Sequence, residues 1–130
     1  MKKIFLLLFV TLSLFAYQAP MTVKGSKTVN STIAFDLHKK GVVFIDVRPA
    51  RFIKDGIIKD AKHVYVEDLT KEKLNSLVKV DEAVVFYCNG PGCSLSAEAI
   101  IKAVSYGYKK IYYYRDGFPG WVYYQLPVDK

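Results

Sequence analysis

Two cysteines in one short loop are the residues best suited to chemistry in this chain. Cys88 follows the apolar run Ala83–Tyr87. Cys93 lies five positions later, at the start of a helix predicted over Ser94–Tyr106. The glycines between the cysteines permit a tight turn with several N–H groups pointing inward. A helix N-terminus stabilises a thiolate, so we expect a lowered pKa for Cys88 and a role as nucleophile or as carrier of an anionic sulfur. The alternative is a buried, apolar cysteine at a strand end.

The segments around this loop predict an α/β fold with a largely parallel sheet. Runs of β-branched and aromatic residues predict strands over Val42–Ile45, His63–Val66, Ala83–Tyr87 and Ile111–Tyr114. Between them we expect helices that begin near Asn30, Thr70 and Ser94, and short helical turns over Arg51–Ile53 and Trp121–Tyr124. Strands alternating with helices are typical of parallel sheets, whose ligands bind at the carboxyl ends of the strands. The cysteine loop lies at such an end.

Composition limits the alternatives. A chain of 130 residues fits one domain, and 52% apolar residues exclude a disordered chain. Two cysteines are too few for a disulfide-rich scaffold, and with two histidines no metal site is expected. The formal net charge is +7, but the basic residues are scattered, so we predict no nucleic-acid partner.

The first residues predict export. Met1–Lys3 is basic and Ile4–Phe15 is almost wholly apolar, which is too short to span a bilayer comfortably but typical of a secretory signal peptide. We predict a signal peptide over residues 1–16, with Ala19 as a later cleavage point and an uncleaved anchor as the alternative. Residues 17–30 are then an N-terminal extension and residues 31–130 the domain. The predicted location is the periplasm or exterior of a bacterium, with no membrane contact after cleavage.

The chain from Ser31 to Val128 resembles the rhodanese-like domains, the sulfurtransferase family. The motifs that carry the resemblance occur in the family's order: Val43–Arg48 ending in "DVR", Arg51–Ala61, Val84–Cys88, Tyr106–Tyr108 with Arg115–Gly117, and Trp121 through Val128. This resemblance implies a five-stranded parallel sheet with helices on both faces. It also implies that Cys88 accepts a sulfane sulfur as a persulfide and passes it to an acceptor.

The resemblance also assigns roles around Cys88. Loop amides would hold the persulfide, and the loop consists of Asn89, Gly90, Pro91, Gly92, Cys93 and Ser94. Supporting or substrate-binding side chains would be Asp46, Arg48, Arg51 and Arg115. Asp46 is expected to orient backbone near the loop. Arg48 would form either a structural ion pair or an anion site, and Arg51 and Arg115 would either add positive field at the loop mouth or lie on the surface. The partners implied are a small sulfur donor and a thiol or cyanide-like acceptor, with the covalent persulfide and no other cofactor.

The loop departs from the family at its last position. Related loops often carry arginine, lysine or threonine where this chain has Cys93, so an anionic donor such as thiosulfate is less favoured. Phosphatases related to this fold place an arginine six residues after the cysteine, where this chain has Ser94, which cannot clamp a phosphate in a bidentate manner. A phosphatase is therefore a poor match.

Cys93 leaves alternatives open. In an oxidising compartment it could form a disulfide with Cys88, resolve a persulfide or sulfenic acid there, or only pack under the helix start. The function we favour is a sulfurtransferase that works through a Cys88 persulfide. The alternatives are a thiol–disulfide redox protein using both cysteines, with a redox partner protein, and a non-catalytic sulfur-binding or interaction module.

Overall fold

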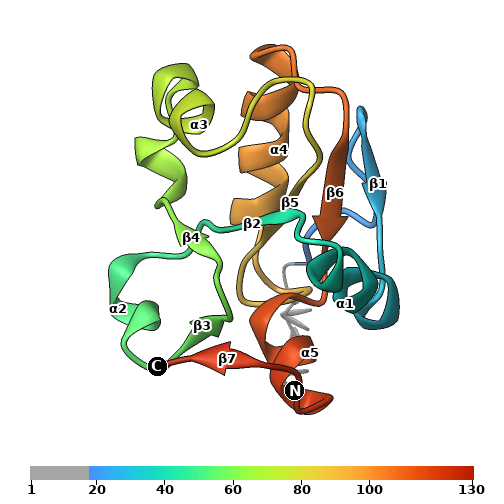
Figure 1. The fold of residues 1–130 in the computed structure, drawn as a ribbon, viewed down its shortest axis with the longest axis vertical. Coiled ribbons are helices and arrows are strands. Elements are labelled where there is room, and N and C mark those ends of the chain that lie inside the picture. Colours follow the sequence, from blue (N-terminus) through green and yellow to red (C-terminus); the bar gives the residue numbers. More distant parts are fainter. Residues whose placement is uncertain (1–17) are drawn as a thin grey trace, which may run out of the picture.

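The computed structural model describes residues 18–130, which form a sheet with helices packed against it (Figure 1). In chain order the elements are β1 (Ser26–Thr28), α1 (Ser31–Lys39), β2 (Val43–Asp46), α2 (Ala50–Ile53), β3 (Ile57–Ile58), β4 (Lys62–His63), the 3-10 helix η1 (Val66–Asp68), α3 (Lys71–Leu77), β5 (Val84–Tyr87), α4 (Leu95–Ser105), β6 (Ile111–Tyr114), α5 (Gly117–Tyr123) and β7 (Val128–Asp129). Across residues 18–130, no helix is both long and apolar enough to cross a membrane. The predicted signal peptide, residues 1–16, lies outside the described residues.

The main sheet has five parallel strands in the order β1-β6-β5-β2-β4, as predicted. All four residues of the central strand β5 are buried, which explains its continuous apolar sequence. The register aligns the carboxyl ends of neighbouring strands. Tyr87 at the end of β5 lies beside Asp46 of β2 and Tyr114 of β6, and Asp46 lies beside His63 of β4. The loop that begins at Cys88 therefore leaves the middle of this edge.

Helices cover both faces of the sheet, which is also as predicted. Alternate side chains of β5 point to opposite faces, so that Phe86 joins one core cluster and Tyr87 the other. Phe86 packs in a cluster with residues of α3 and α4, including Leu74 and Ile100. Tyr87 lies in a cluster with residues of α1 and α5, including Trp121. The cysteine loop joins β5 to α4 and is thus attached to two elements of the core.

The sheet begins earlier than the sequence suggests. Residues 17–30 are predicted to be an extension, but Ser26–Thr28 forms the edge strand β1 and pairs with Ile111–Tyr113 of β6 (Figure 1). This strand is short, polar and largely exposed. It is held by backbone hydrogen bonds and not by an apolar face, so it carries no hydrophobic pattern that could have predicted it. The folded unit therefore includes residues upstream of Ser31.

Other differences concern short elements. An antiparallel pair of β3 and β7 forms a second small sheet, in which Ile58 lies opposite Val128. Only the first residue of the strand predicted over His63–Val66 pairs in the sheet, and Val66 begins η1. The helix predicted from Trp121 begins at Gly117. Two-residue strands and a helix start rich in glycine and proline have too little periodicity to be predicted from sequence.

Candidate active site

The loop after β5 turns tightly and closes on the start of α4. The N–H of Cys93 donates to the carbonyl oxygen of Gly90 at 2.9 Å, which closes a turn within the loop. Gly90 has a φ of +100°, a conformation that glycine adopts without steric cost. The carbonyl oxygen of Cys88 accepts a hydrogen bond from the N–H of Phe118 at 2.9 Å, so the start of α5 also holds the loop.

Cys88 is buried, with only 1% of its surface exposed. Its Sγ donates to the carbonyl oxygen of Cys93 at 3.3 Å and lies 3.3 Å from the Oγ of Ser96. The N–H of Ser96, in the first turn of α4, donates to the same sulfur at 3.4 Å. First-turn N–H groups have no partner within their helix, so this one is free to bind sulfur. Ser96 was not among the predicted site residues, although its position two residues after Ser94 places it in the first helical turn.

Cys93, and not Cys88, faces the open cavity in front of the loop. This cavity has a volume of about 530 Å³ and is lined by Pro49, Arg51, Phe52, Asn89, Gly92, Cys93, Ser94 and Leu95. Cys93 is half-buried, and its thiol lies near enough to the Cys88 thiol and to the N–H groups of Asn89 and Leu95 for these groups to shift its pKa. Of the loop amides that were predicted to hold a persulfide, that of Asn89 acts on the sulfur of Cys93. Pro91, also on the loop, is exposed, whereas Gly90 is buried.

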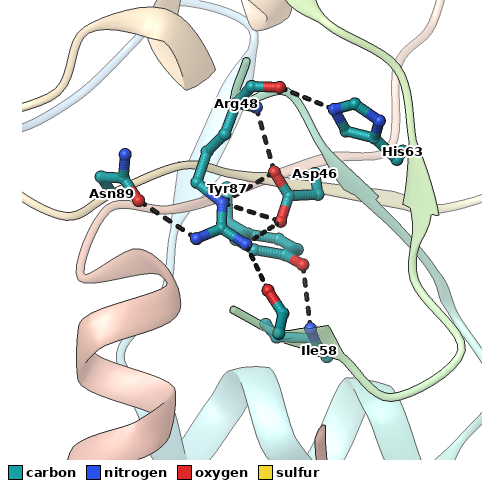
Figure 2. Close-up of polar contacts among 7 residues, drawn as sticks. Asp46, Arg48, Ile58, His63, Tyr87 and Asn89 are labelled. Carbon is teal, nitrogen blue, oxygen red and sulfur yellow. Dashed lines mark hydrogen bonds and ion pairs between the residues drawn. The ribbon is translucent and has the colours of Figure 1, made fainter. Parts of the chain in front are cut away.

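Asp46 and Arg48 form a buried ion pair beside the loop (Figure 2). The Nη2 of Arg48 lies 2.7 Å from the Oδ2 of Asp46, and the side chains are 2% and 0% exposed. The backbone N–H of Arg48 donates to Asp46, and Nη2 also donates to the carbonyl oxygen of Gly56. The Nη1 donates to the Oδ1 of Asn89 at 3.2 Å. Of the two alternatives for Arg48, the structure shows the ion pair, which ties the end of β2 to the cysteine loop.

Tyr87 and His63 make further hydrogen bonds around this ion pair (Figure 2). The Tyr87 hydroxyl accepts from the N–H of Ile58 at 3.1 Å, and the Nε2–H of His63 donates to the carbonyl oxygen of Arg48 at 2.7 Å. Burial raises the pKa of Tyr87, and the Asp46 carboxylate raises it further, so the phenol stays protonated. These side chains position backbone and do not line the cavity in front of Cys93.

The two remaining arginines have separate positions. Arg51 is exposed, stacks over the ring of Phe52 at 4.7 Å and lines the cavity beside Cys93. Arg115 does not line this cavity. Its Nη2 donates to the carbonyl oxygen of Ala19 at 2.8 Å, and its Nε donates to that of Pro20 at 3.1 Å. Positive charge at the loop mouth therefore comes from Arg51.

The segment just before β1 braces the outer side of the loop. Ala19 is buried, and its N–H donates to the carbonyl oxygen of Pro91 at 2.7 Å. The Tyr113 hydroxyl and the Nε of Arg115 both donate to the carbonyl oxygen of Pro20, the next residue of this segment. Cleavage after Ala19, the later of the two predicted points, would remove the hydrogen bond to Pro91. The position of the cut thus bears on the stability of the loop.

Comparison with known proteins identifies the family. The family model described as "Rhodanese-like domain" matches residues 32–123. The chain belongs to the rhodanese-like domain family. No curated protein matches it in sequence.

Solved structures agree on the rhodanese-like fold. A Bacillus halodurans protein has a TM-score of 0.71 at 21% identity, covering 80% of this chain and 77% of its own. A human single-domain sulfurtransferase has a TM-score of 0.64 at 20% identity, covering 75% and 96% respectively. A Rhodopseudomonas palustris protein, described as a possible tyrosine phosphatase, has a TM-score of 0.65 at 25% identity and covers 80% and 85%.

The electrostatics of this rhodanese-like loop favour a thiolate on Cys93. The neighbouring Cys93 side chain and burial raise the pKa of Cys88. The pKa of Cys93 is lowered to about 6, first by the Cys88 side chain and then by the N–H groups of Asn89 and Leu95, which together outweigh the opposing effects of burial and Glu98. The expectation that the helix start lowers the pKa of Cys88 is therefore wrong for the dithiol. The loop stabilises one thiolate, and that thiolate belongs to the cysteine facing the cavity.

A pH profile of alkylation should report this difference. We expect iodoacetamide to modify Cys93 at neutral pH while Cys88 stays unmodified, as located by peptide mass. The rate should reach a plateau above about pH 6 and fall tenfold per pH unit below it, because only the thiolate reacts. In Cys88→Ala, which removes the hydrogen bond to Cys93, the midpoint should move to higher pH. An unmoved midpoint, or modification of Cys88 first, would contradict the assignment.

Metal chemistry has no obvious ligand set here. Among residues 18–130, no three histidine, cysteine, aspartate or glutamate side chains gather closely enough to hold an ion. Within the described part of the chain, the reactive or charged groups at the loop are its two thiols, its amides and Arg51.

Proposed function

We propose that this rhodanese-like domain is a sulfurtransferase in which Cys88 carries a sulfane sulfur as a persulfide to a thiophilic acceptor. The observation that carries the proposal is the position of the Cys88 sulfur. It lies at the carboxyl end of the central strand, where the N–H of Ser96 in the first turn of α4 donates to it at 3.4 Å. A helix N-terminus and its N–H groups would stabilise the negative charge of a persulfide anion at this position. The human sulfurtransferase shares the fold, which agrees with the proposal.

The thiol pair supplies the first proton transfer. Cys88 is a thiol that shares a hydrogen bond with Cys93, which has the lower pKa. The Cys93 thiolate accepts the proton of Cys88, and the resulting Cys88 thiolate attacks the sulfane sulfur of the donor. The donor's remaining group leaves with the bonding electron pair, as sulfite from thiosulfate or as a thiolate from a persulfide. A nucleophilic acceptor, a thiol or cyanide, then attacks the outer sulfur and regenerates Cys88.

The cavity favours some donors over others. Arg51 is the single basic residue among the side chains that line it, and the loop itself has none. A dianion such as thiosulfate would meet one exposed cation, which binds weakly in water. A small persulfide needs less charge compensation, so we propose persulfides as the better donor class. Export to the periplasm or exterior, which the first 16 residues predict, forms part of this proposal, as does the absence of a cofactor beyond the persulfide itself.

Phosphate-ester hydrolysis fits the site less well. The Rhodopseudomonas palustris protein is described as a possible tyrosine phosphatase. In this chain Ser94 stands six places after Cys88, where the related phosphatases have an arginine, and Arg48 is occupied by Asp46, Gly56 and Asn89. The loop therefore offers no bidentate partner for a phosphate.

Intact-mass measurement tests the sulfurtransferase. Cys93→Ser, incubated anaerobically with glutathione persulfide and separately with thiosulfate, should gain one sulfur atom and should lose it to cyanide as thiocyanate. This variant lacks the thiolate that accepts the Cys88 proton, so loading is followed to completion at alkaline pH. The matched Cys88→Ser variant should gain no sulfur and form no thiocyanate. Equal loading and transfer by folded Cys88→Ser would disprove the role of Cys88.

A further inference from the structure

The two cysteines of the loop are arranged so that one can attack a persulfide formed on the other. Cys88 is buried and Cys93 faces the cavity, yet the two residues are in direct contact, because the Sγ of Cys88 donates to the carbonyl oxygen of Cys93 at 3.3 Å. We propose that Cys93 attacks the Sγ of persulfidated Cys88, releases the sulfane sulfur as hydrosulfide and leaves a Cys88–Cys93 disulfide. This inference rests on the proposed persulfide at Cys88. It gives that persulfide a second fate besides transfer to an acceptor, which is the reductive release of sulfide.

The step balances without an added oxidant. The bond that forms joins the Sγ atoms of Cys93 and Cys88, and the bond that breaks joins the Sγ of Cys88 to the sulfane sulfur. The electron pair of the broken bond leaves with the sulfane sulfur as HS⁻, so that sulfur is reduced by two electrons. Each cysteine sulfur is oxidised by one electron as the disulfide forms. Cys93 carries the proton that it accepted from Cys88 during loading, and this proton passes to the departing sulfane sulfur as the Cys93 sulfur attacks. The persulfide anion and the Cys93 thiol thus become the disulfide and HS⁻.

The loop supports this attack in two ways. The hydrogen bond from the Cys88 Sγ to the carbonyl oxygen of Cys93 holds the two cysteines next to each other, so the nucleophile lies beside the persulfide. The turn closed by the Cys93 N–H and the carbonyl oxygen of Gly90 brings the backbone of residue 93 back over Cys88. A family cation at this position would compensate the charge of a bound donor. A thiol there can instead consume the persulfide.

Turnover then requires a dithiol reductant, which we infer to be a protein with a nucleophilic cysteine. Thiol–disulfide exchange is controlled by which sulfur the attacking thiolate can reach. Cys93 lines the cavity and Cys88 does not, so the reductant attacks the sulfur of Cys93 and Cys88 leaves as the thiol. The mixed disulfide of the cycle should therefore form on Cys93.

A single-turnover experiment without reductant tests the release of sulfide. Reduced wild-type protein and Cys93→Ser are treated anaerobically with glutathione persulfide at alkaline pH until loading of the variant is complete, and excess donor is then removed by desalting. Wild-type protein should release one sulfide per chain and lose two hydrogens in intact mass, with the Cys88–Cys93 bond located by peptide mapping. The Cys93→Ser variant should keep one added sulfur and release none. Ser105→Ala, a change at an exposed serine at the far end of α4 that preserves both thiols, should behave as wild type.

The possible results separate the two proposals. If Cys93→Ser holds the sulfur and wild-type protein also keeps it as a stable persulfide without sulfide release, the resolving role is wrong while the sulfurtransferase stands. If neither Cys93→Ser nor Cys93→Ala gains sulfur although both are folded by circular dichroism, the Cys88 persulfide itself is wrong. A disulfide in anaerobic wild-type protein that never met the donor would show oxidation by another route and would also overturn the resolving role.

Discussion

Replacing Arg48 by methionine is expected to lower the free energy of unfolding by about 3–5 kcal/mol. Methionine has a similar length and fills the volume, but it leaves the Asp46 carboxylate buried without a counter-charge. The change also leaves the carbonyl oxygen of Gly56 without its donor and frees Asn89 at the start of the loop. Denaturation in urea, at an unchanged slope with denaturant, would measure the loss. We also expect slower persulfide loading, because Asn89 contributes an N–H to the cradle around Cys93.

Two variants show whether the lost charge causes this effect. Arg51→Met changes the same residue type three positions away, at an exposed site, and should alter stability by no more than about 0.5 kcal/mol. Asp46→Asn combined with Arg48→Met removes both charges while an amide oxygen can still accept the N–H of residue 48. The double variant should therefore be more stable than Arg48→Met alone, by about 1 kcal/mol or more. If it is less stable, the unpaired carboxylate does not account for the loss.

The elements that carry the cysteine loop could be predicted because burial imposes a pattern on them. The strands β2, β5 and β6 lie in the middle of the sheet and read as continuous apolar runs. Asn30 and Thr70 were predicted to begin helices, and their side chains accept hydrogen bonds from the first turns of α1 and α3. The loop at Cys88 follows from these elements, since a strand end and a helix start fix its two sides.

The contacts between the cysteine loop and the segment before β1 could not be predicted in this way, because they involve backbone groups far apart in the sequence. The bond from Ala19 to Pro91 and the bonds from Arg115 to Ala19 and Pro20 depend on carbonyl and N–H groups, which every residue carries. The same holds for β1, which is an exposed polar edge strand. From sequence, Arg115 could either add positive field at the loop mouth or lie on the surface. Its guanidinium binds the carbonyl groups of Ala19 and Pro20, which come close only in the folded chain.

The pKa is raised at Cys88 and lowered at Cys93, the reverse of what the sequence suggests, and this difference also depends on contacts made only in the folded loop. From sequence, a helix start lowers the pKa of whichever thiol lies next to it, and Cys88 was the expected one. In the structure the N–H groups of Asn89 and Leu95 meet the sulfur of Cys93, while Cys88 is buried and donates. The sequence places both thiols in one loop, but only the turn between them determines which sulfur the amides reach.

Gly117→Ala should also be strongly damaging, lowering the free energy of unfolding by about 3 kcal/mol or more. Gly117 has a φ of +62°, and a Cβ atom there would overlap the carbonyl oxygen of Cys88 and lie 2.7 Å from the N of Gly90. Both neighbours are backbone, so neither can move aside by changing a rotamer. The carbonyl of Cys88 would have to shift, which breaks its hydrogen bond from Phe118 and displaces the sulfur.

Gly41→Ala provides the matched control, because Gly41 has a φ of +80° but no atom within 4 Å of the position that an alanine methyl group would take. It should therefore lose only the cost of the left-handed backbone, about 1–2 kcal/mol, and should load sulfur at the wild-type rate. The excess loss of stability in Gly117→Ala then measures the overlap with the loop, and its loading rate reports the displaced Cys88. If both variants lose the same stability and load sulfur equally fast, the close approach of α5 does not hold the loop in place.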